Sequence, residues 1–199
     1  MARAAYHHGD LRAACVRAAV DLLEEGDETA LSLRAVARRA GVSPAAPYRH
    51  YADREALVSA VAAVGYLDLA ERLRAAHPSP STSEQLASVA VAYVQFAIDR
   101  PALFRIMFSE PCDRDNDDRV AATAAVSLYL RGIVERAFPQ ADAEALATAI
   151  WALVHGLAFL HLDGKLDASS PTVVAARVSA AIEAMLTTAG SRGRTADGD

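Results

Sequence analysis

Apolar residues recur every three or four positions along most of this chain, which is the spacing of one face of an α-helix. The pattern predicts helices over residues 10–25, 33–40, 43–51, 53–76, 83–99, 101–108, 119–138, 142–162 and 171–189. Alanine is abundant and runs of β-branched residues are few, and both features favour helix over strand. The sequence therefore predicts an all-α protein.

Residues 32–51 have the pattern of a helix-turn-helix. Ser32 suits the N-cap of the first helix, and Gly41 permits the positive φ that a tight turn between two helices requires. Ser43 and Pro44 suit the cap and the first position of the next helix. This order predicts a recognition helix that docks in a DNA major groove.

The predicted recognition helix is expected to start irregularly. Pro47 lacks the N–H that would make the first backbone hydrogen bond of that helix. Ala45 and Ala46 have no hydrogen-bonding side-chain atoms, although their methyl groups can contact thymine methyls. Direct reading of base edges then depends on Arg34 and Arg49.

Basic side chains are concentrated in this motif. The chain has a formal net charge of −5, which by itself argues against nucleic-acid binding. Residues 1–60 contain eight arginines and eight acidic residues, so the whole −5 comes from residues 61–199. No acid occurs between Thr29 and Ala52, where a formal charge of +4 comes from Arg34, Arg38, Arg39 and Arg49. A basic face on an acidic protein is typical of an electrostatic DNA-binding site.

The N-terminal arm, residues 1–9, carries Arg3 and Tyr6 and has no helical periodicity. Such an arm can follow phosphates or enter the minor groove, or it can be a disordered terminus with no role. Arg3, Tyr6 and Ser32 are therefore included among the candidate DNA contacts.

The predicted helices fall into two domains and a tail. Residues 1–55 are expected to form a three-helix DNA-binding domain, and the long helix at 53–76 joins it to the rest. Residues 56–190 are expected to form a helical ligand-binding and dimerisation domain. The polar residues 191–199 are expected to be disordered.

The helix at 142–162 is apolar on nearly all sides, so both of its faces need to be covered. We expect one face to line the domain interior and the other to join the last helix in a four-helix bundle between two copies. The predicted dimer interface consists of Leu153, Leu157, Leu160, Val174, Val178, Ile182 and Met185. A monomer with a thicker core is the alternative.

A set of mainly aromatic residues in the C-terminal half has two interpretations. It lines an apolar ligand cavity, or it is simply the core. The set is Tyr93, Phe96, Phe104, Met107, Phe108, Trp151, His155 and Phe159. The same alternatives hold for His155, which is a polar contact inside the cavity or a core histidine with its hydrogen bonds satisfied.

No catalytic constellation and no metal-ligand spacing is found in the sequence. Cys15 and Cys112 are too few for a disulfide framework. No apolar run of roughly 18 residues, as expected of a membrane span, is identified, and the N-terminus lacks the apolar core of a signal peptide. We therefore expect a cytoplasmic, non-enzymatic protein without cofactor, metal or membrane partner.

The segment SLRAVARRAGVSPAAPYRHYADREAL, residues 32–57, resembles the DNA-binding region of the TetR family of transcriptional regulators. The residues in register with that family are Gly41, Val42, Ser43, Tyr48, His50 and Leu57. Pro47 departs from the pattern, which usually has Leu or Ile there. RPALFRIMFS at 100–109, and Trp151 with His155 and Gly156, resemble the C-terminal region of a branch named for its Trp-His-Gly motif.

The resemblance implies an all-helical homodimer with two recognition helices and a ligand pocket in each C-terminal domain. It implies that Ser43, Tyr48, His50 and Arg54 hold phosphates, and that Arg34, Ala45, Ala46 and Arg49 face bases. We therefore expect a ligand-responsive regulator, most consistent with a repressor that an unknown small molecule releases from a double-stranded DNA operator. The alternatives are a helical ligand-binding or interaction module with weak or no specific DNA binding, and a small helical enzyme, for which no reactive pair is found.

Overall fold

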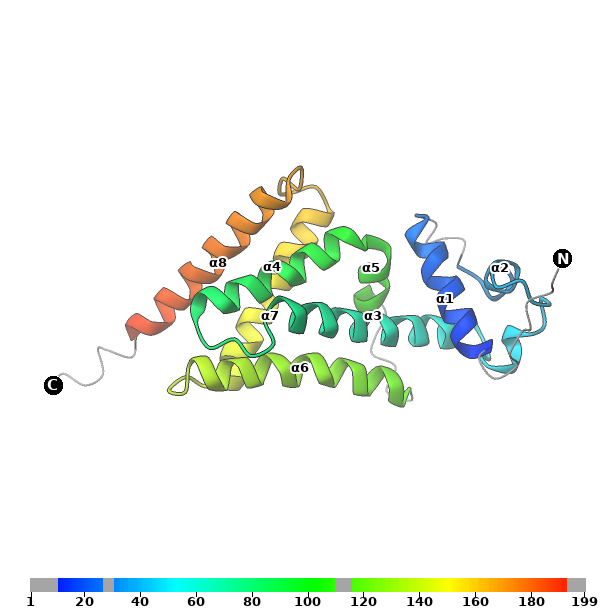
Figure 1. Ribbon diagram of the computed structural model, residues 1–199, viewed down its shortest axis with the longest axis horizontal. Coiled ribbons are helices and arrows are strands. Elements are labelled where there is room, and N and C mark those ends of the chain that lie inside the picture. Colours follow the sequence, from blue (N-terminus) through cyan, green and yellow to red (C-terminus); the bar gives the residue numbers. More distant parts are fainter. Residues whose placement is uncertain (1–10, 27–30, 110–115, 193–199) are drawn as a thin grey trace. The chain divides into compact units, whose positions relative to one another are not determined.

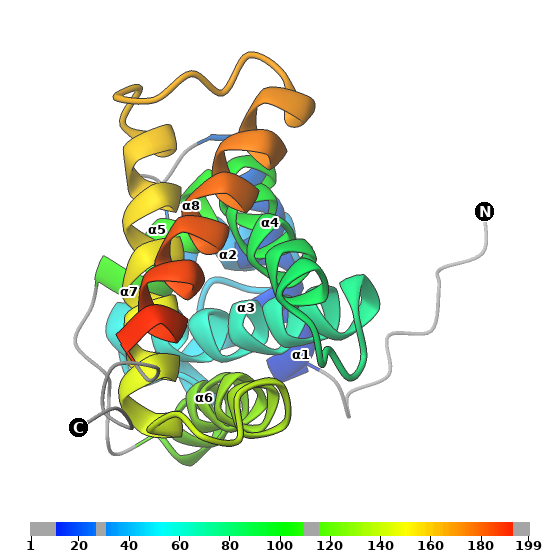
Figure 2. The same ribbon diagram turned by 90° about the vertical axis from the view of Figure 1, so that its left-hand side faces the viewer.

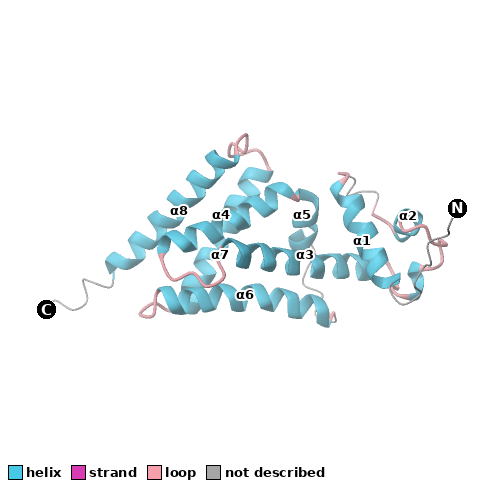
Figure 3. Ribbon diagram, in the orientation of Figure 1, coloured by secondary structure: helices cyan, strands magenta, loops and turns pink. Residues whose placement is uncertain are grey.

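The structure, a computed structural model of the chain, describes residues 11–26, 31–109 and 116–192. Within these ranges it consists of eight α-helices and one short 3-10 helix, with no strand (Figure 1, Figure 3). They are α1 (Leu11–Glu24), α2 (Leu33–Arg39), the 3-10 helix η1 (Pro47–Arg49), α3 (Arg54–Ala76), α4 (Ser83–Asp99), α5 (Pro101–Ser109), α6 (Asp117–Ala137), α7 (Ala143–Leu162) and α8 (Pro171–Arg192). The all-α prediction is confirmed.

Side-chain caps determine where several helices begin. The Oγ of Ser32 accepts a hydrogen bond from the N–H of Ala35 at 3.2 Å, at the start of α2. Asp53 accepts from the N–H of Ala56 at 2.9 Å, at the start of α3. Asp142 accepts from two N–H groups in the first turn of α7, both at 3.1 Å. Each such cap stabilises its helix by about 1 kcal/mol, and the Ser32 cap confirms the sequence prediction.

Backbone contacts group the chain into two compact units. The first comprises Met1–Gly65 with Ala102–Ala122, and the second comprises Tyr66–Pro101 with Thr123–Asp199. Helices α3 and α6 therefore contribute to both units. This grouping differs from the sequence-based division at residue 55, because most of α5 and the first turns of α6 belong with the N-terminal helices.

In the first unit, α1, α2 and the beginning of α3 enclose an apolar core. Its buried side chains include Cys15, Leu23, Val36, Leu57 and Val61. Helix α5 approaches α3 closely, since a Cβ added to Gly65 would lie 2.7 Å from the Sδ of Met107. An exposed ion pair between Arg12 and Asp118, at 3.0 Å, links α1 to α6.

In the second unit, α4 packs against both α8 and α7 (Figure 2). The side chains of Val174, Val178 and Ile182 on α8 are at most 1% exposed within the single chain. These three residues were predicted to lie in a dimer interface. Within the single chain they are buried and α8 packs against α4, so they offer almost no exposed surface to a partner.

Helix α7 is long and apolar enough to cross a membrane, by length and composition alone. The expectation that the chain has no such run is therefore wrong. Core helices of soluble proteins meet the same criterion, and α7 does pack against α4 and α8. Only 28% of its apolar window is buried inside the chain. Helix α7 thus retains an apolar surface that its own chain does not cover.

Candidate DNA-binding surface and effector site

The turn after α2 is a Schellman motif. The N–H of Val42 donates to the carbonyl of Ala37 at 3.0 Å, and the N–H of Gly41 donates to that of Arg38 at 3.2 Å. Gly41 has a φ of +68°, which glycine adopts without steric cost. The prediction that Gly41 ends the helix through a positive φ is confirmed.

The recognition segment that follows is not an α-helix. After turns at residues 44–46, only Pro47–Arg49 is helical, and its hydrogen bonding is that of a 3-10 helix. The carbonyl of Ser43 accepts from the N–H of Ala46 at 2.9 Å. In an α-helix it would pair with residue 47, but Pro47 has no N–H to donate. The predicted irregularity is confirmed, whereas the predicted α-helix over 43–51, with Ser43 as its cap, is wrong.

Pro47 and Tyr51 hold this segment against the rest of the first unit. Pro47 is buried, and its carbonyl accepts from the N–H groups of His50 and Tyr51 at 2.9 and 3.0 Å. Tyr51 is only 2% exposed, and its hydroxyl donates to the carbonyl of Arg12 on α1 at 3.0 Å. Burial raises the pKa of Tyr51, so the phenol keeps the proton that it donates. No local pattern in the sequence indicates this role, because Tyr51 and Arg12 are far apart in the chain.

Most of the predicted DNA contacts are exposed. These are Ser32, Arg34, Ser43, Ala45, Tyr48, Arg49, His50 and Arg54, and Ala46 is partly exposed. Tyr48 is 52% exposed, so its side chain is accessible to a partner. Arg54 also has a structural contact, because its Nε donates to the carbonyl of Leu31 at 3.0 Å. Arg3 and Tyr6 lie outside the described residues.

One of the four arginines of the basic window is neutralised locally. Arg39 forms an ion pair with Glu25. The hydrogen bond from Arg39 lowers the pKa of the Glu25 carboxyl, so the pair stays charged. Across the described ranges, Arg34, Arg38 and Arg49 have no carboxylate partner. Three arginines therefore remain available to an anionic partner.

A hydrogen-bonded cluster connects α4 and α7. The Nε1–H of Trp151 donates to the hydroxyl of Tyr93 at 3.3 Å, and this hydroxyl lies 3.1 Å from the Nδ1 of His155. Since the indole can only donate, the Tyr93 hydroxyl accepts from Trp151. The direction of the bond between this hydroxyl and Nδ1 depends on which ring nitrogen of His155 carries the proton. Phe159 packs edge-on against the His155 ring, with centroids 4.9 Å apart.

The predicted ligand contacts fall in different units of the fold. Tyr93, Phe96, Trp151, His155 and Phe159 belong to the second unit, and Phe104, Met107 and Phe108 belong to the first. The cavity beside Tyr93, lined by apolar residues of α3, α4, α6 and α7, has a volume of about 10 Å³. Such a volume holds at most one water molecule, so around Tyr93 these residues pack as core.

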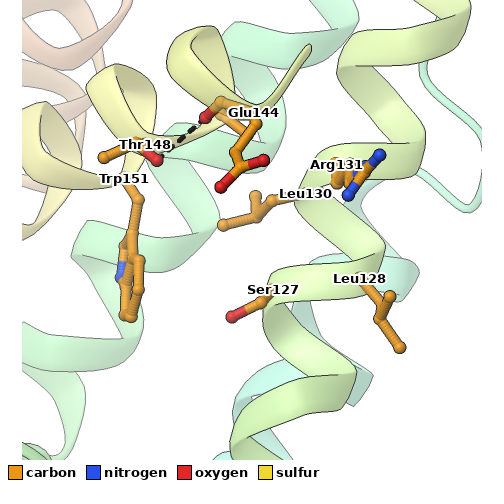
Figure 4. Close-up of a pocket in the computed structure, with 8 residues that line it drawn as sticks. Ser127, Leu128, Leu130, Arg131, Glu144, Thr148 and Trp151 are labelled. Carbon is orange, nitrogen blue, oxygen red and sulfur yellow. Dashed lines mark hydrogen bonds between the residues drawn. The ribbon is translucent and has the colours of Figure 1, made fainter.

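A groove of about 300 Å³ lies between α6 and α7 in the second unit (Figure 4). Its lining residues are Ser127, Leu128, Leu130, Arg131, Glu144, Ala147, Thr148 and Trp151. In Figure 4 the Glu144 side chain extends from α7 toward Leu130. The volume is at the lower end of the range for small-molecule sites. Of these residues only Trp151 was predicted from the sequence, although Glu144, Thr148 and Trp151 are spaced along one face of α7 and could have indicated the groove.

Comparison with known proteins identifies the family. The family described as "Bacterial regulatory proteins, tetR family" matches residues 16–61, and "Tetracyclin repressor-like, C-terminal domain" matches residues 86–188. The chain belongs to the TetR family. Members of this family are DNA-binding transcriptional regulators and not enzymes, so the regulator and non-enzyme predictions are confirmed at that level.

Solved structures similar to this TetR-family protein cover nearly its whole length. A protein of unknown function from Rhodococcus sp. RHA1 is 34% identical, with a TM-score of 0.74 over 92% of this chain and 98% of its own. A regulatory protein in the tetR family from Rhodococcus RHA1 is 24% identical, with a TM-score of 0.64 over 86% and 95%. The fatty acid degradation regulator FadR from Bacillus halodurans is 13% identical, with a TM-score of 0.66 over 89% and 95%. The last two show the fold alone.

The His155 cluster predicts a loss of stability in mild acid. Burial lowers the pKa of His155 in the folded state, whereas a histidine side chain in the unfolded chain has a pKa near 6.5. Between the lowered value and 6.5 the unfolded state binds more protons, so the free energy of unfolding falls as the pH falls through this window. Because His155 is only partly buried, we expect an effect below about 1 kcal/mol.

Urea unfolding at pH 7.5 and at pH 5.5 measures this effect. His155→Gln is expected to lose less stability than the wild type between these two pH values, because the titrating group is gone. Equal losses in both proteins would show that His155 does not titrate differently in the folded and unfolded states.

Proposed function

We propose that this TetR-family protein is a cytoplasmic, homodimeric repressor that a small amphipathic molecule releases from its operator. The observation that carries the proposal is the exposed basic surface around the recognition segment. Arg34, Arg38 and Arg49 are exposed and lack carboxylate partners among the described residues, on a chain with a net charge of −5. A basic surface on a protein whose other residues carry net negative charge favours binding to the phosphates of DNA.

The recognition segment is proposed to face the major groove, with Arg34 and Arg49 at base edges. Ser43, Tyr48 and His50 are proposed to contact phosphates, since short polar and phenolic side chains position a protein on the backbone without reading sequence. Arg54 is proposed to act mainly through its bond to the Leu31 carbonyl, which positions the segment before α2, and secondarily through phosphate.

Two substitutions separate base reading from phosphate contact. Arg49→Ala is expected to relax preference at one base position by about tenfold or more, because a bidentate guanidinium contact is lost. Tyr48→Phe is expected to weaken binding to all sequences equally, by about three- to tenfold, because one phosphate hydrogen bond is lost. Electrophoretic mobility shifts on the DNA beside its own gene, at several salt concentrations, measure both effects.

Lys165→Ala is the matched control, because it removes one exposed positive charge from the turn between α7 and α8, outside the recognition surface. It is expected to leave binding unchanged. If the wild-type chain gives no salt-sensitive shift on any DNA, the repressor proposal fails. The alternative, a helical interaction module without specific DNA binding, is favoured by the short 3-10 recognition segment and would then hold.

The effector is proposed to bind in the groove between α6 and α7. Its walls combine Leu128, Leu130 and Ala147 with one arginine, one glutamate and the indole of Trp151. The indole N–H is already bonded to Tyr93 on α4. An effector that moves Trp151 therefore also disturbs a hydrogen bond to α4. Helix α3 precedes α4 in the chain and contributes to both units. It therefore connects α4 to the DNA-binding unit through the backbone.

Ala147→Phe is expected to fill the groove without blocking operator binding. Trp151 is the only tryptophan in the chain, so its fluorescence reports directly on the groove. A compound that changes this fluorescence and releases operator from the wild type is expected to do neither with Ala147→Phe. Ala124→Phe, on the exposed side of α6, is the matched control and should respond like the wild type. Equal operator release from wild type and Ala147→Phe would place the effector elsewhere.

The dimer is proposed to form through the uncovered apolar surface of α7, with exposed residues of α8 beside it. Leu160 is 43% exposed and Val173 is 38% exposed, while Leu153 and Met185 are partly exposed. Leu157 is 8% exposed and contributes little surface. Gly156 is exposed, and a Cβ there would meet nothing within 4 Å in the single chain.

Gly156→Arg tests this interface without disturbing the fold of one chain. In the monomer the new side chain enters open space, but in the dimer it places a charge between two apolar helices. We expect the dimer dissociation constant to rise by about tenfold or more, while Ala124→Arg on α6 leaves it unchanged. Sedimentation equilibrium measures the mass against the chain mass of 21.0 kDa. A stable Gly156→Arg dimer would rule out this surface.

A further inference from the structure

We propose that this protein selects thymine at the centre of its recognition surface through the C5-methyl group, without hydrogen bonds to those bases. The element that does so is the apolar tip, defined as residues 44–46. This inference rests on the proposed function and specifies what that function recognises.

The apolar tip lacks hydrogen-bond donors almost completely. Its side chains are Pro44, Ala45 and Ala46, which carry only methyl and methylene groups. Pro44 has no N–H, and the N–H of Ala46 is already bonded to the carbonyl of Ser43 at 2.9 Å. A base edge placed against the side chains of this tip meets carbon atoms and no side-chain donor.

The tip is both exposed and held in place. Pro44 and Ala45 are exposed and Ala46 is partly exposed, whereas Pro47 directly after them is buried. The Schellman turn at Gly41 fixes the chain before the tip, and the bond from Tyr51 to the carbonyl of Arg12 fixes the chain after it. Its methyl groups therefore sit on a preorganised surface, and little entropy is lost when they meet DNA.

Thymine is the base that this surface distinguishes. In the major groove only thymine presents a methyl group, while the other three bases present donors or acceptors alone. Contact with the thymine methyl removes apolar surface from water and is favourable. Contact with an amino group or a guanine oxygen would strip water from a polar atom and return no hydrogen bond. Arg34 and Arg49 are left to read flanking positions.

The test begins with selection of an operator from random DNA by the full-length protein. Each thymine of the selected site is then replaced, one at a time, by deoxyuridine, which lacks only the methyl group. We expect about a three- to fivefold loss of affinity at one or two thymines in each half-site. Replacing such a T·A pair by C·G is expected to weaken binding further, and 5-methylcytosine at that position is expected to restore part of the loss.

Ala45→Gly links the effect to the tip. With this variant, operators carrying thymine or deoxyuridine at one of the sensitive positions are expected to bind with equal affinity. Ala52→Gly changes another exposed alanine just beyond the 3-10 helix, and this variant is expected to retain the difference in affinity. The Arg49→Ala protein is expected to bind all of these operators more weakly. The ratio of its affinities for the thymine and deoxyuridine operators is expected to stay the same, because Arg49 is proposed to contact a different base.

Operator binding that is salt-sensitive but equal for thymine and deoxyuridine at every position overturns this inference and leaves the proposed function standing. The same holds if Ala45→Gly and Ala52→Gly retain identical thymine preference. Absence of salt-sensitive binding to any selected DNA overturns the proposed function, and this inference with it.

Discussion

The amide hydrogen that Pro47 lacks is the constraint on which the DNA-binding surface depends. An α-helix over residues 43–51 would need that hydrogen for its first bond to the carbonyl of Ser43. The chain forms a 3-10 helix of three residues instead, and the carbonyl of Ser43 pairs with Ala46. Pro47 is nevertheless buried, so the position still serves the core of the unit. The recognition segment is therefore still anchored to the core of the unit, although its backbone forms a turn and a 3-10 helix in place of an α-helix. This backbone leaves the apolar tip, residues 44–46, exposed.

The second unit depends on a different principle, the sharing of side chains between packing and binding. Trp151 lines the groove with one part of its indole and bonds to Tyr93 on α4 with its N–H. The Tyr93 hydroxyl in turn shares a hydrogen bond with Nδ1 of His155. A ligand in the groove therefore acts on a residue that already belongs to a partly buried network. In such a network the loss of one bond leaves its partners unsatisfied and carries a higher free-energy cost than the loss of an exposed contact.

Local signals predicted the helices well, because periodicity, caps and breakers act within a few residues of each other. Ser32 and Gly41 perform the capping and turning roles that their types and positions indicated. The burial of Val174, Val178 and Ile182 shows the limit of this reasoning. An apolar stripe indicates that a helix face must be covered, but not whether α4 of the same chain or a second chain covers it. The same reasoning grouped Tyr93 and Phe104 in one predicted pocket, but these two residues belong to different units. Local patterns do not indicate which unit a residue joins.

The sequence by itself determined the all-helical fold, the helix-turn-helix order, the exception at Pro47 and the membership of the TetR family, because these follow from residue types at short, fixed spacings. Only the tertiary structure decided that Arg39 is neutralised by Glu25, that Tyr51 anchors the recognition segment to α1, and that a groove opens between α6 and α7. These features join residues that are far apart in the chain or lie on different helices. Their pairing depends on how the helices pack, and no local pattern encodes that packing.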